Sequence, residues 1–389
     1  MFEERGKPRG LVLEELGRVL QADSTYSSGR PVASMSTTPH DIGVEVFMRA
    51  IEKNAARFHT FKGSERIEKE LLSMLGELMH LDEAVGTTTS GGTESNVLAM
   101  LAAREAAKDR TTRPVVIAPE TIHSSVDKAA WLLGVKLVKT RVDREFRAVP
   151  EAVMEAITKD TVGIFATAGS TYLGQVDPIP EIAGIAADHS LPLHVDAAFG
   201  GFVIPFLRDL GLGEYQFDFA VRGVTSISID PHKMGLVPVP AGCILFRDAD
   251  QLKRVTYKVP YLRGESSLQR SILGTRPAGS IIAAWAVMRH LGREGYRRVV
   301  AECMRVTMTG AERIERSQSI QLALRPLMNI LAIQVKKRPI DKVVDEMETR
   351  GWRMAISPNP QSIRVIVMPH VTQSVMTAFL DDLEEIADK

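Results

Sequence analysis

Hydrophobic and polar positions along the middle of this chain follow two periods in turn. Short apolar runs, typical of buried strands, are AVGTTTS (84–90), VVIAP (115–119), KLVKTRV (136–142), VGIFATA (162–168), LPLHVDAA (191–198), SISIDPHK (226–233) and AGCILFRD (241–248). Patterns with a helical period separate several of them, as in TESNVLAMLAAREAAK (93–108) and SSVDKAAWLL (124–133). Such alternation predicts right-handed βαβ units and a mostly parallel sheet covered by helices.

The two ends of the chain have a different pattern. We expect an amphipathic helix over residues 1–20, an extended segment over 24–40 and helices over about 42–81. After residue 274 the pattern is helical to about 315, and two strand-like runs and a closing helix follow. We therefore predict an N-terminal helical and extended segment (1–55), a large domain (56–275) and a small C-terminal α+β domain (276–389).

Composition and charge narrow the class of protein. The chain has 389 residues, 44% hydrophobic and 25% charged, with a formal net charge of zero. No global field therefore favours nucleic acid or an anionic membrane, and no apolar run is long enough for a membrane span. Cys243 and Cys303 are the two cysteines, which excludes a disulfide framework and a cysteine metal site. We expect a cytoplasmic protein without a structural metal.

Two ionisable residues fall at the expected carboxyl edge of the sheet, where open α/β folds bind ligands. Lys233 ends the run SISIDPHK, and its amine can form an imine with an aldehyde cofactor. Asp196 ends the strand LHVD, and a carboxylate there needs a cation or hydrogen bonds. The ring nitrogen of pyridoxal 5′-phosphate (PLP) is such a cation, and Ala198 is small enough to leave room for a ring. Taken alone, a surface lysine and a capping aspartate are the commoner explanations.

Two further strand ends carry possible cofactor contacts. In TSGGTESN (89–96), Gly92 lets the backbone approach an anion that the helix start and the Thr93 hydroxyl can bind. The motif is neither a Walker P-loop nor a dinucleotide fingerprint. His123 follows the strand 115–119, and its imidazole can stack on a planar cofactor. Taken alone, a capped turn explains the first motif equally well, and a capping or packing histidine is the commoner explanation of the second. The four motifs together indicate a PLP site.

The chain resembles the group II PLP-dependent decarboxylases in three sequence motifs, which occur in the order TSGGTESN, HVDAAFGGF and SIDPHKMG. The resemblance runs through the whole chain, including SMSTTPH (34–40) near the start, PAGCILFRD (240–248) after the lysine and RVIVMPHVT (364–372) near the end. It implies PLP fold type I, the aspartate-aminotransferase-like α/β fold, with a mostly parallel central sheet in the large domain. It also implies a homodimer with shared active sites that decarboxylates an L-amino acid at Cα, with tyrosine or aspartate as the substrates it suggests.

The resemblance also assigns roles to individual residues. Catalytic roles go to Lys233, His232, His123 and Asp196. Cofactor contacts go to Lys233, Gly92, Thr93, His123, Thr171, Asp196, Ala198, His232 and Thr275. Thr275 is expected to reach the phosphate in the neighbouring subunit. Arg364 is expected to bind a substrate carboxylate, although a surface salt bridge explains it nearly as well. Tyr261 is a possible substrate contact. The stretch 261–274 is shorter than the catalytic loop of the animal aromatic decarboxylases, and Tyr261 does not clearly match the tyrosine of that loop, so Tyr261, His232 and Lys233 are all candidate proton donors.

Three other functions fit parts of the sequence. A carbon–carbon lyase of the sphingosine-1-phosphate lyase type shares the cofactor and releases an aldehyde in place of CO₂. A cysteine desulfurase needs a cysteine on a mobile loop, whereas both cysteines here lie in predicted strand or helix. A non-catalytic α/β scaffold or nucleotide-binding module predicts a colourless protein.

Overall fold

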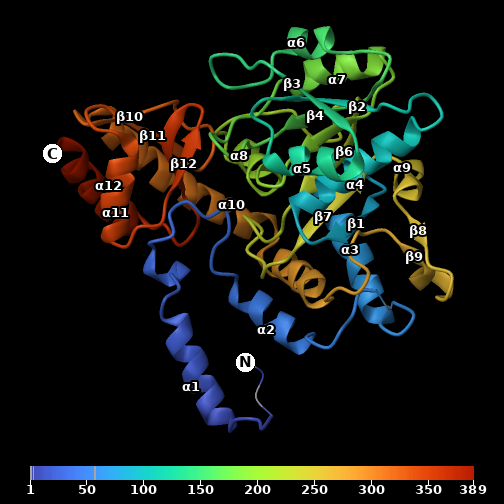
Figure 1. The fold of residues 1–389 in the computed structure, drawn as a ribbon, viewed down its shortest axis with the longest axis horizontal. Helices are drawn as coiled ribbons and strands as arrows, with labels where there is room; N and C mark the ends of the chain where they lie inside the picture. The colour runs from blue at the N-terminus through green and yellow to red at the C-terminus, as the bar shows by residue number, and fades with distance from the viewer. Residues whose placement is uncertain (1, 3, 57) are drawn as a thin grey trace.

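The computed structural model describes residues 2, 4–56 and 58–389. Its centre is a seven-stranded sheet in the order β1-β7-β6-β5-β4-β2-β3, in which β7 runs antiparallel to both neighbours and the other pairs are parallel (Figure 1). The strands are β1 (Val85–Thr89), β2 (Val115–Pro119), β3 (Lys136–Thr140), β4 (Thr161–Thr167), β5 (Leu193–Asp196), β6 (Val224–Ile229) and β7 (Gly242–Phe246). The predicted mostly parallel sheet is confirmed. The predicted motifs follow its strands and meet at its carboxyl edge.

Helices cover both faces of this sheet. One face carries α4 (Gly92–Ala106), α5 (Ser124–Leu133) and α9 (Ala249–Arg254). The other face carries α3 (Lys62–Leu78), α6 (Pro150–Glu155), α7 (Ile179–Asp188) and α8 (Ile204–Asp209). A short hairpin, β8 (Tyr257–Lys258) with β9 (Leu268–Gln269), follows α9. The helix–sheet–helix layering is that of a doubly wound α/β domain.

The side chains of β5 and β6 differ between the two faces of the sheet. Val195 and Ile227 point to one face and are fully buried in its apolar core. The alternate positions, which face α4, hold His194 and Asp196 on β5 and Ser226 and Ser228 on β6, all buried. A polar layer therefore lies between α4 and the carboxyl half of the sheet, and buried polar groups need hydrogen-bond partners.

The C-terminal part of the chain forms a smaller lobe. Its antiparallel sheet has the order β10-β11-β13-β12. Its elements are α10 (Gly279–Glu315), β10 (Ile320–Leu322), β11 (Ile330–Val335), α11 (Ile340–Thr349), β12 (Ala355–Pro358), β13 (Gln361–Ile366) and α12 (Gln373–Asp388). The long α10, interrupted at Gly292 (φ 56°), packs on both lobes and joins them (Figure 1).

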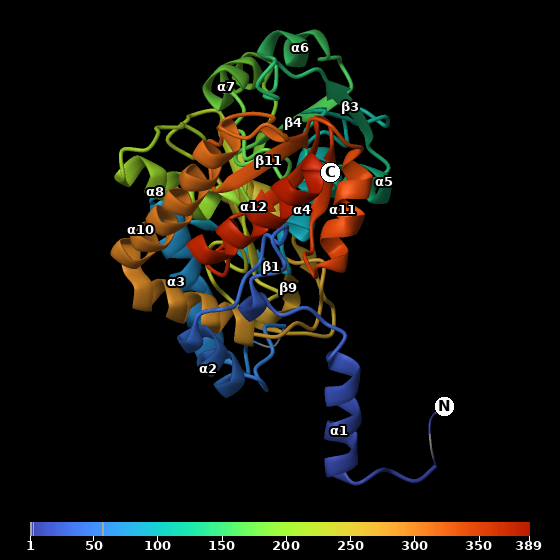
Figure 2. The same ribbon diagram turned by 90° about the vertical axis from the view of Figure 1, so that its left-hand side faces the viewer.

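The N-terminal segment differs in part from its prediction. The helix expected over residues 1–20 is α1 (Arg9–Leu20), which begins only after Pro8, because proline disfavours a helix interior. Its leucines are about half exposed, and α1 stands apart from the body of the chain in both views (Figures 1 and 2). A 3-10 turn (Tyr26–Ser28) and α2 (Asp41–Arg49) follow. Within the described residues, no helix is long and apolar enough to cross a membrane.

Candidate active site

Most of the candidate residues line one cavity of about 630 Å³ at the carboxyl edge of the large sheet. They are Gly92, Thr93, His123, Thr171, Asp196, Ala198, His232, Lys233 and Arg364. The ends of β1, β2, β4, β5 and β6 supply all of them except Arg364, which comes from β13 of the small lobe. Residues from distant parts of the chain meet here because the carboxyl ends of parallel strands share one edge.

Asp196 is the buried anion of this cavity, with 6% of its surface exposed. It accepts hydrogen bonds from Asn96 Nδ2 (2.8 Å), the Ser228 hydroxyl (3.0 Å) and the Ala198 main-chain N–H (3.1 Å). Burial opposes ionisation, but the charge of Lys233 and the hydrogen bond from Asn96 outweigh it and lower the pKa of Asp196. The carboxyl group is therefore held in its charged form at a site that faces the cavity.

Lys233 lies beside a second buried carboxylate, Asp230. The Lys233 Nζ is 3.4 Å from Asp230 Oδ2, and the His232 Nε2 is 3.6 Å from the same oxygen. That oxygen also accepts the main-chain N–H of Gly92 at 3.0 Å, whereas Asp230 Oδ1 is enclosed and has no hydrogen-bond partner among the residues that the structure describes. The Asp230 carboxylate thus ties the lysine-bearing turn to the start of α4.

The turn between β1 and α4 leaves no room for side chains. Gly91 has φ +150°, which L residues rarely adopt, and a Cβ there would lie 3.0 Å from His232 Cε1. A Cβ on Gly92 would lie 2.9 Å from Ala198 Cβ. Thr93 is exposed in the first turn of the helix. The result is a close-fitting backbone loop at a helix N-terminus, the kind of structure that binds phosphate.

His123 both caps a helix and lines the cavity. Its Nδ1 accepts the Ser125 main-chain N–H (3.2 Å) at the start of α5 and lies 2.8 Å from the Ser125 hydroxyl. Burial lowers the pKa of His123, although the charge of Asp196 opposes the shift. The imidazole is therefore neutral at neutral pH, with its proton on Nε2. His123 therefore serves as the N-cap of α5 and lines the cavity at the same time.

Arg364 reaches the cavity from the opposite lobe. Its Nη1 donates to the Thr171 carbonyl (3.1 Å) and its Nη2 donates to the Ala33 carbonyl (3.3 Å), while its enclosed Nε has no hydrogen-bond partner within the described part of the chain. Burial lowers the pKa of Arg364, and nearby Tyr172 opposes the shift, but a guanidinium keeps its charge in proteins. Among the described residues its hydrogen-bond partners are main-chain carbonyls, and no carboxylate pairs with it. The surface salt bridge considered from the sequence is absent from this part of the chain.

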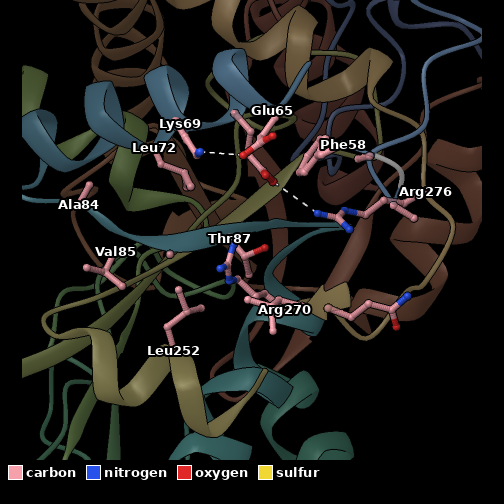
Figure 3. A pocket seen from close by; sticks show the side chains of 16 residues that line it. Phe58, Glu65, Lys69, Leu72, Ala84, Val85, Thr87, Leu252, Arg270 and Arg276 are labelled. Atoms are coloured by element: carbon pink, nitrogen blue, oxygen red, sulfur yellow. Dashed lines mark hydrogen bonds and ion pairs between the residues drawn. The ribbon is translucent and has the colours of Figure 1, made fainter. Parts of the chain in front are cut away.

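Two candidates lie outside this cavity in the single chain. Tyr261 is 77% exposed, and Thr275 is exposed in the segment before α10. Next to Thr275, Arg276 borders a separate cavity of about 270 Å³ between α3, β1 and β9, where it pairs with buried Glu68 at 3.4 Å (Figure 3). The roles expected for Thr275 and Tyr261 stay predictions.

The cysteines offer no reactive thiol near the cavity. Cys243 lies in β7 and Cys303 in α10, and both are buried. Burial raises the pKa of both thiols, that of Cys303 to about 12. Neither lines the cavity that holds Lys233, and a thiol in this form is a poor nucleophile. The desulfurase alternative therefore lacks its nucleophile.

Several residues of the site did not stand out in the sequence. Asp230 is part of the motif around Lys233, and its place between a strand end and a lysine was a usable signal. Asn96 and Ser228 contact Asp196 from α4 and β6, and Met35 lines the cavity from the N-terminal segment. Nothing local marks these three, because their roles depend on how distant elements pack.

The residues fit PLP. The Lys233 amine suits its aldehyde, the anionic Asp196 its ring nitrogen, and the backbone loop at Gly91 and Gly92 its phosphate. Asp196 supports this fit, because its hydrogen-bond donors are all neutral and a buried anion is best matched by a cation. The electron sink that PLP supplies when bound serves reactions at the Cα of amino acids.

Comparison with known proteins identifies the family. Residues 25–336 match the pyridoxal-dependent decarboxylase conserved domain. The chain is 43% identical to the L-aspartate decarboxylase of Thermococcus kodakarensis over 389 residues, 100% of both chains. It is 41% identical over 362 residues to the probable L-tyrosine/L-aspartate decarboxylase of Methanothermobacter thermautotrophicus, covering 93% of this chain and 98% of that one.

Solved structures agree with this assignment. The sphingosine-1-phosphate lyase of Burkholderia pseudomallei superposes with a TM-score of 0.92 at 29% identity, covering 100% of this chain and 92% of that one. A glutamate decarboxylase of Lactobacillus brevis superposes with a TM-score of 0.90 at 22% identity, covering 99% and 94%, and supports the fold alone. The predicted fold type I architecture is confirmed. The chain belongs to the pyridoxal-dependent decarboxylase family and is a PLP-dependent amino-acid decarboxylase.

Proposed function

We propose that the substrate is L-aspartate, which loses its α-carboxylate as CO₂ and leaves as β-alanine. The observation that carries this proposal is the half-buried Arg364, a cation that lines the cavity and has no carboxylate partner among the described residues. The names of relatives more than 40% identical support it, since those from Pyrococcus abyssi and Thermococcus kodakarensis are both called aspartate decarboxylases. Tyrosine, the other substrate expected from the sequence, carries no side-chain carboxylate for this cation.

The chain's own residues divide the work. Lys233 would hold the cofactor through its amine, whose Nζ lies 3.4 Å from Asp230 Oδ2 and so within reach of that carboxylate. Asp196 would pair with the ring nitrogen and favour its protonated form, while His123 and Ala198 would flank the ring. His232, fixed by the main chain of Ala241 at 2.6 Å, lies beside Lys233, so these two side chains are the candidates to return a proton to Cα.

The chemistry of decarboxylation favours binding of the carboxylate that stays. If Arg364 paired with the departing α-carboxylate, the ion pair would stabilise the ground state and be lost when CO₂ forms, which slows the reaction. Pairing with the side-chain carboxylate survives the whole reaction. It also offsets the cost of burying a cation without a counter-ion.

The test compares substrates in Arg364 variants. Purified enzyme with PLP is given L-aspartate, L-glutamate and L-tyrosine, and CO₂ and amine are measured. Wild type should turn over L-aspartate best. Arg364→Gln should lose about 30- to 5,000-fold in kcat/KM for L-aspartate, because truncating one partner of a buried charge pair costs about 2–5 kcal/mol. Arg364→Lys keeps the charge without the planar guanidinium fork, so its kcat/KM for L-aspartate should lie between those of wild type and Arg364→Gln.

Three results would contradict the proposal. An Arg364→Gln enzyme that keeps its preference for L-aspartate would remove Arg364 from specificity. An equal loss for L-aspartate and L-tyrosine would place the α-carboxylate on Arg364. Cleavage of a phosphorylated amino alcohol to an aldehyde, without CO₂ from any amino acid, would favour the lyase alternative.

We also propose that the working unit is a homodimer in which Thr275 completes the partner's phosphate site. Thr275 is exposed, while Arg276 beside it is anchored by Glu68 and by the N–H of Ala55, which donates to its carbonyl at 2.9 Å. An anchored segment that presents a polar side chain to solvent is suited to an interface. The exposed leucines of α1 supply further apolar area for association.

We place this reaction in the cytoplasm. Both cysteines are free and buried, as suits a reducing compartment. The amino-acid substrate is a small soluble molecule, and the proposed site needs no other partner.

A further inference from the structure

One buried amide lies behind the Asp196 carboxylate. Asn96, on α4, is fully buried and has all its polar groups engaged. Its Nδ2 donates to Asp196 Oδ2 (2.8 Å) and to the Ser125 hydroxyl (2.8 Å), and its Oδ1 lies 2.9 Å from His194 Nε2. The amide therefore connects three side chains, from β5 and α5, that differ in chemistry.

Hydrogen-bond chemistry determines how these groups are oriented. A carboxylate only accepts, so the NH₂ group of Asn96 must face Asp196 and its oxygen must face His194. His194 Nε2 must then carry a proton and donate it, while Nδ1 accepts from the Ser226 hydroxyl at 2.9 Å. Burial keeps His194 neutral, so it has a single N–H to offer. The histidine thereby prevents the amide from rotating its oxygen toward the carboxylate.

The same amide also fixes the histidine on the cofactor side. The Ser125 hydroxyl accepts from Asn96, so its own proton is directed to His123 Nδ1, 2.8 Å away. This leaves His123 with its proton on Nε2, toward the cavity. A single side chain thus orients both Asp196 and His123, although it lines the cavity at no point.

We propose that Asn96 and His194 are positioning residues for the reaction. His194 locks the Asn96 amide, and the locked amide keeps Asp196 ionised and aligned while it sets the tautomer of His123. The inference rests on the proposed roles of Asp196 and His123 at the two sides of the cofactor ring. A purely structural role would instead stabilise the packing of α4 on β5 and leave the chemistry of bound PLP unchanged.

The test uses three variants of the full-length enzyme. His194→Leu removes the N–H donor, and a cavity of about 260 Å³ beside His194 gives the new side chain room to adjust. His194→Gln is the matched control, because its amide can still donate to Asn96 Oδ1. Asn96→Asp keeps the shape of the side chain but replaces the NH₂ donor with an acceptor. Thermal unfolding and circular dichroism show which variants fold.

Three readouts separate positioning from structure. They are the dissociation constant of PLP for the apoenzyme, the pH at which the visible absorption band of the loaded enzyme changes, and kcat per bound PLP. We expect His194→Leu to move the spectral transition and to lower kcat about ten- to hundredfold, the usual loss when a supporting partner is removed. KM should change little, His194→Gln should stay within about threefold of wild type, and Asn96→Asp should lose more than His194→Leu.

Two results would overturn the inference. One is a folded His194→Leu enzyme with wild-type kcat per bound PLP and a wild-type spectral transition. The other is a His194→Gln enzyme as impaired as His194→Leu. If His194→Leu does not fold, a folded Asn96→Asp enzyme whose spectral transition occurs at the wild-type pH would also overturn the inference. Asp196→Asn belongs in the spectral series: if it leaves the transition unmoved, the proposed role of Asp196 fails, independently of the Asn96 network.

Discussion

Replacing Asp196 with asparagine tests the electrostatic centre of the site. The substitution keeps the shape of the side chain and removes its charge. Asp196 Oδ1 accepts from Ser228 and Ala198, and Oδ2 accepts from Asn96. An asparagine can place its oxygen toward only one of these sets, so its NH₂ group must face another donor.

The size of the effect follows from these contacts. The misplaced NH₂ group leaves a buried donor unsatisfied, which costs about 1–3 kcal/mol of stability. Loss of the charge opposite the ring nitrogen costs more in rate, because truncating one partner of a buried ion pair costs about 2–5 kcal/mol. Taking about 4 kcal/mol, kcat should fall about a thousandfold.

The assay measures CO₂ release at saturating PLP and L-aspartate, with circular dichroism and thermal unfolding for the fold. Asp177→Asn is the matched control, since Asp177 is also buried, accepts the N–H groups of Ala148 and Thr167, and does not line the cavity. It should lose stability but keep its kcat. A loss of less than tenfold in folded Asp196→Asn, about 1.4 kcal/mol, would refute the role of the carboxylate.

Three further predictions address the lysine, the assembly and the response to acid. Lys233→Ala should abolish turnover and the borohydride-sensitive absorption band of the loaded enzyme; a normal rate would remove Lys233 from the chemistry. The assembly is tested by mixing two variants, Lys233→Ala and Thr275→Arg, that should each be inactive alone. After dissociation and reassociation together, about half the dimers are mixed and each mixed dimer holds one intact site of two, so about a quarter of wild-type activity should return. No recovery in verified mixed dimers would contradict the shared site. The free energy of unfolding should decrease as pH drops from about 6.5 toward 4, because burial lowers the pKa of His194 from 6.5 to about 4 and the unfolded chain takes up that proton first. The midpoint of thermal unfolding should fall less with pH in His194→Gln than in wild type. An equal pH dependence of the two midpoints would count against a neutral buried His194.

The sequence predicts which candidate residues meet at the carboxyl edge of the large sheet, and the reason is geometric. Lys233, Asp196, His123 and Gly92 each follow a strand, and parallel strands bring their carboxyl ends to one edge. Their convergence therefore needs only the strand pattern and the connection rule. The pattern does not give strand direction, so the antiparallel β7 carries no signal of its own in AGCILFRD.

The supporting residues are not predictable in the same way. Asn96 lies inside a helix, where an asparagine is as consistent with a solvent-facing position as with a buried one. His194 interrupts an otherwise apolar strand, and its partner Asn96 is 98 residues distant along the chain. Identifying this pair requires the packing of α4 on β5, which depends on tertiary structure.

The two ends of the cavity are built by different parts of the chain, and this bears on specificity. The edge of the large sheet supplies the groups that suit PLP, whereas Arg364 comes from the small lobe and is held by carbonyls at Ala33 and Thr171. The orientation of the guanidinium therefore depends on how the N-terminal segment, the large sheet and β13 meet. A change at that junction can redirect Arg364 without touching Lys233 or Asp196. Relatives that keep the cofactor edge can thus differ in the side chain they accept, as the aspartate, glutamate and tyrosine in their names indicate.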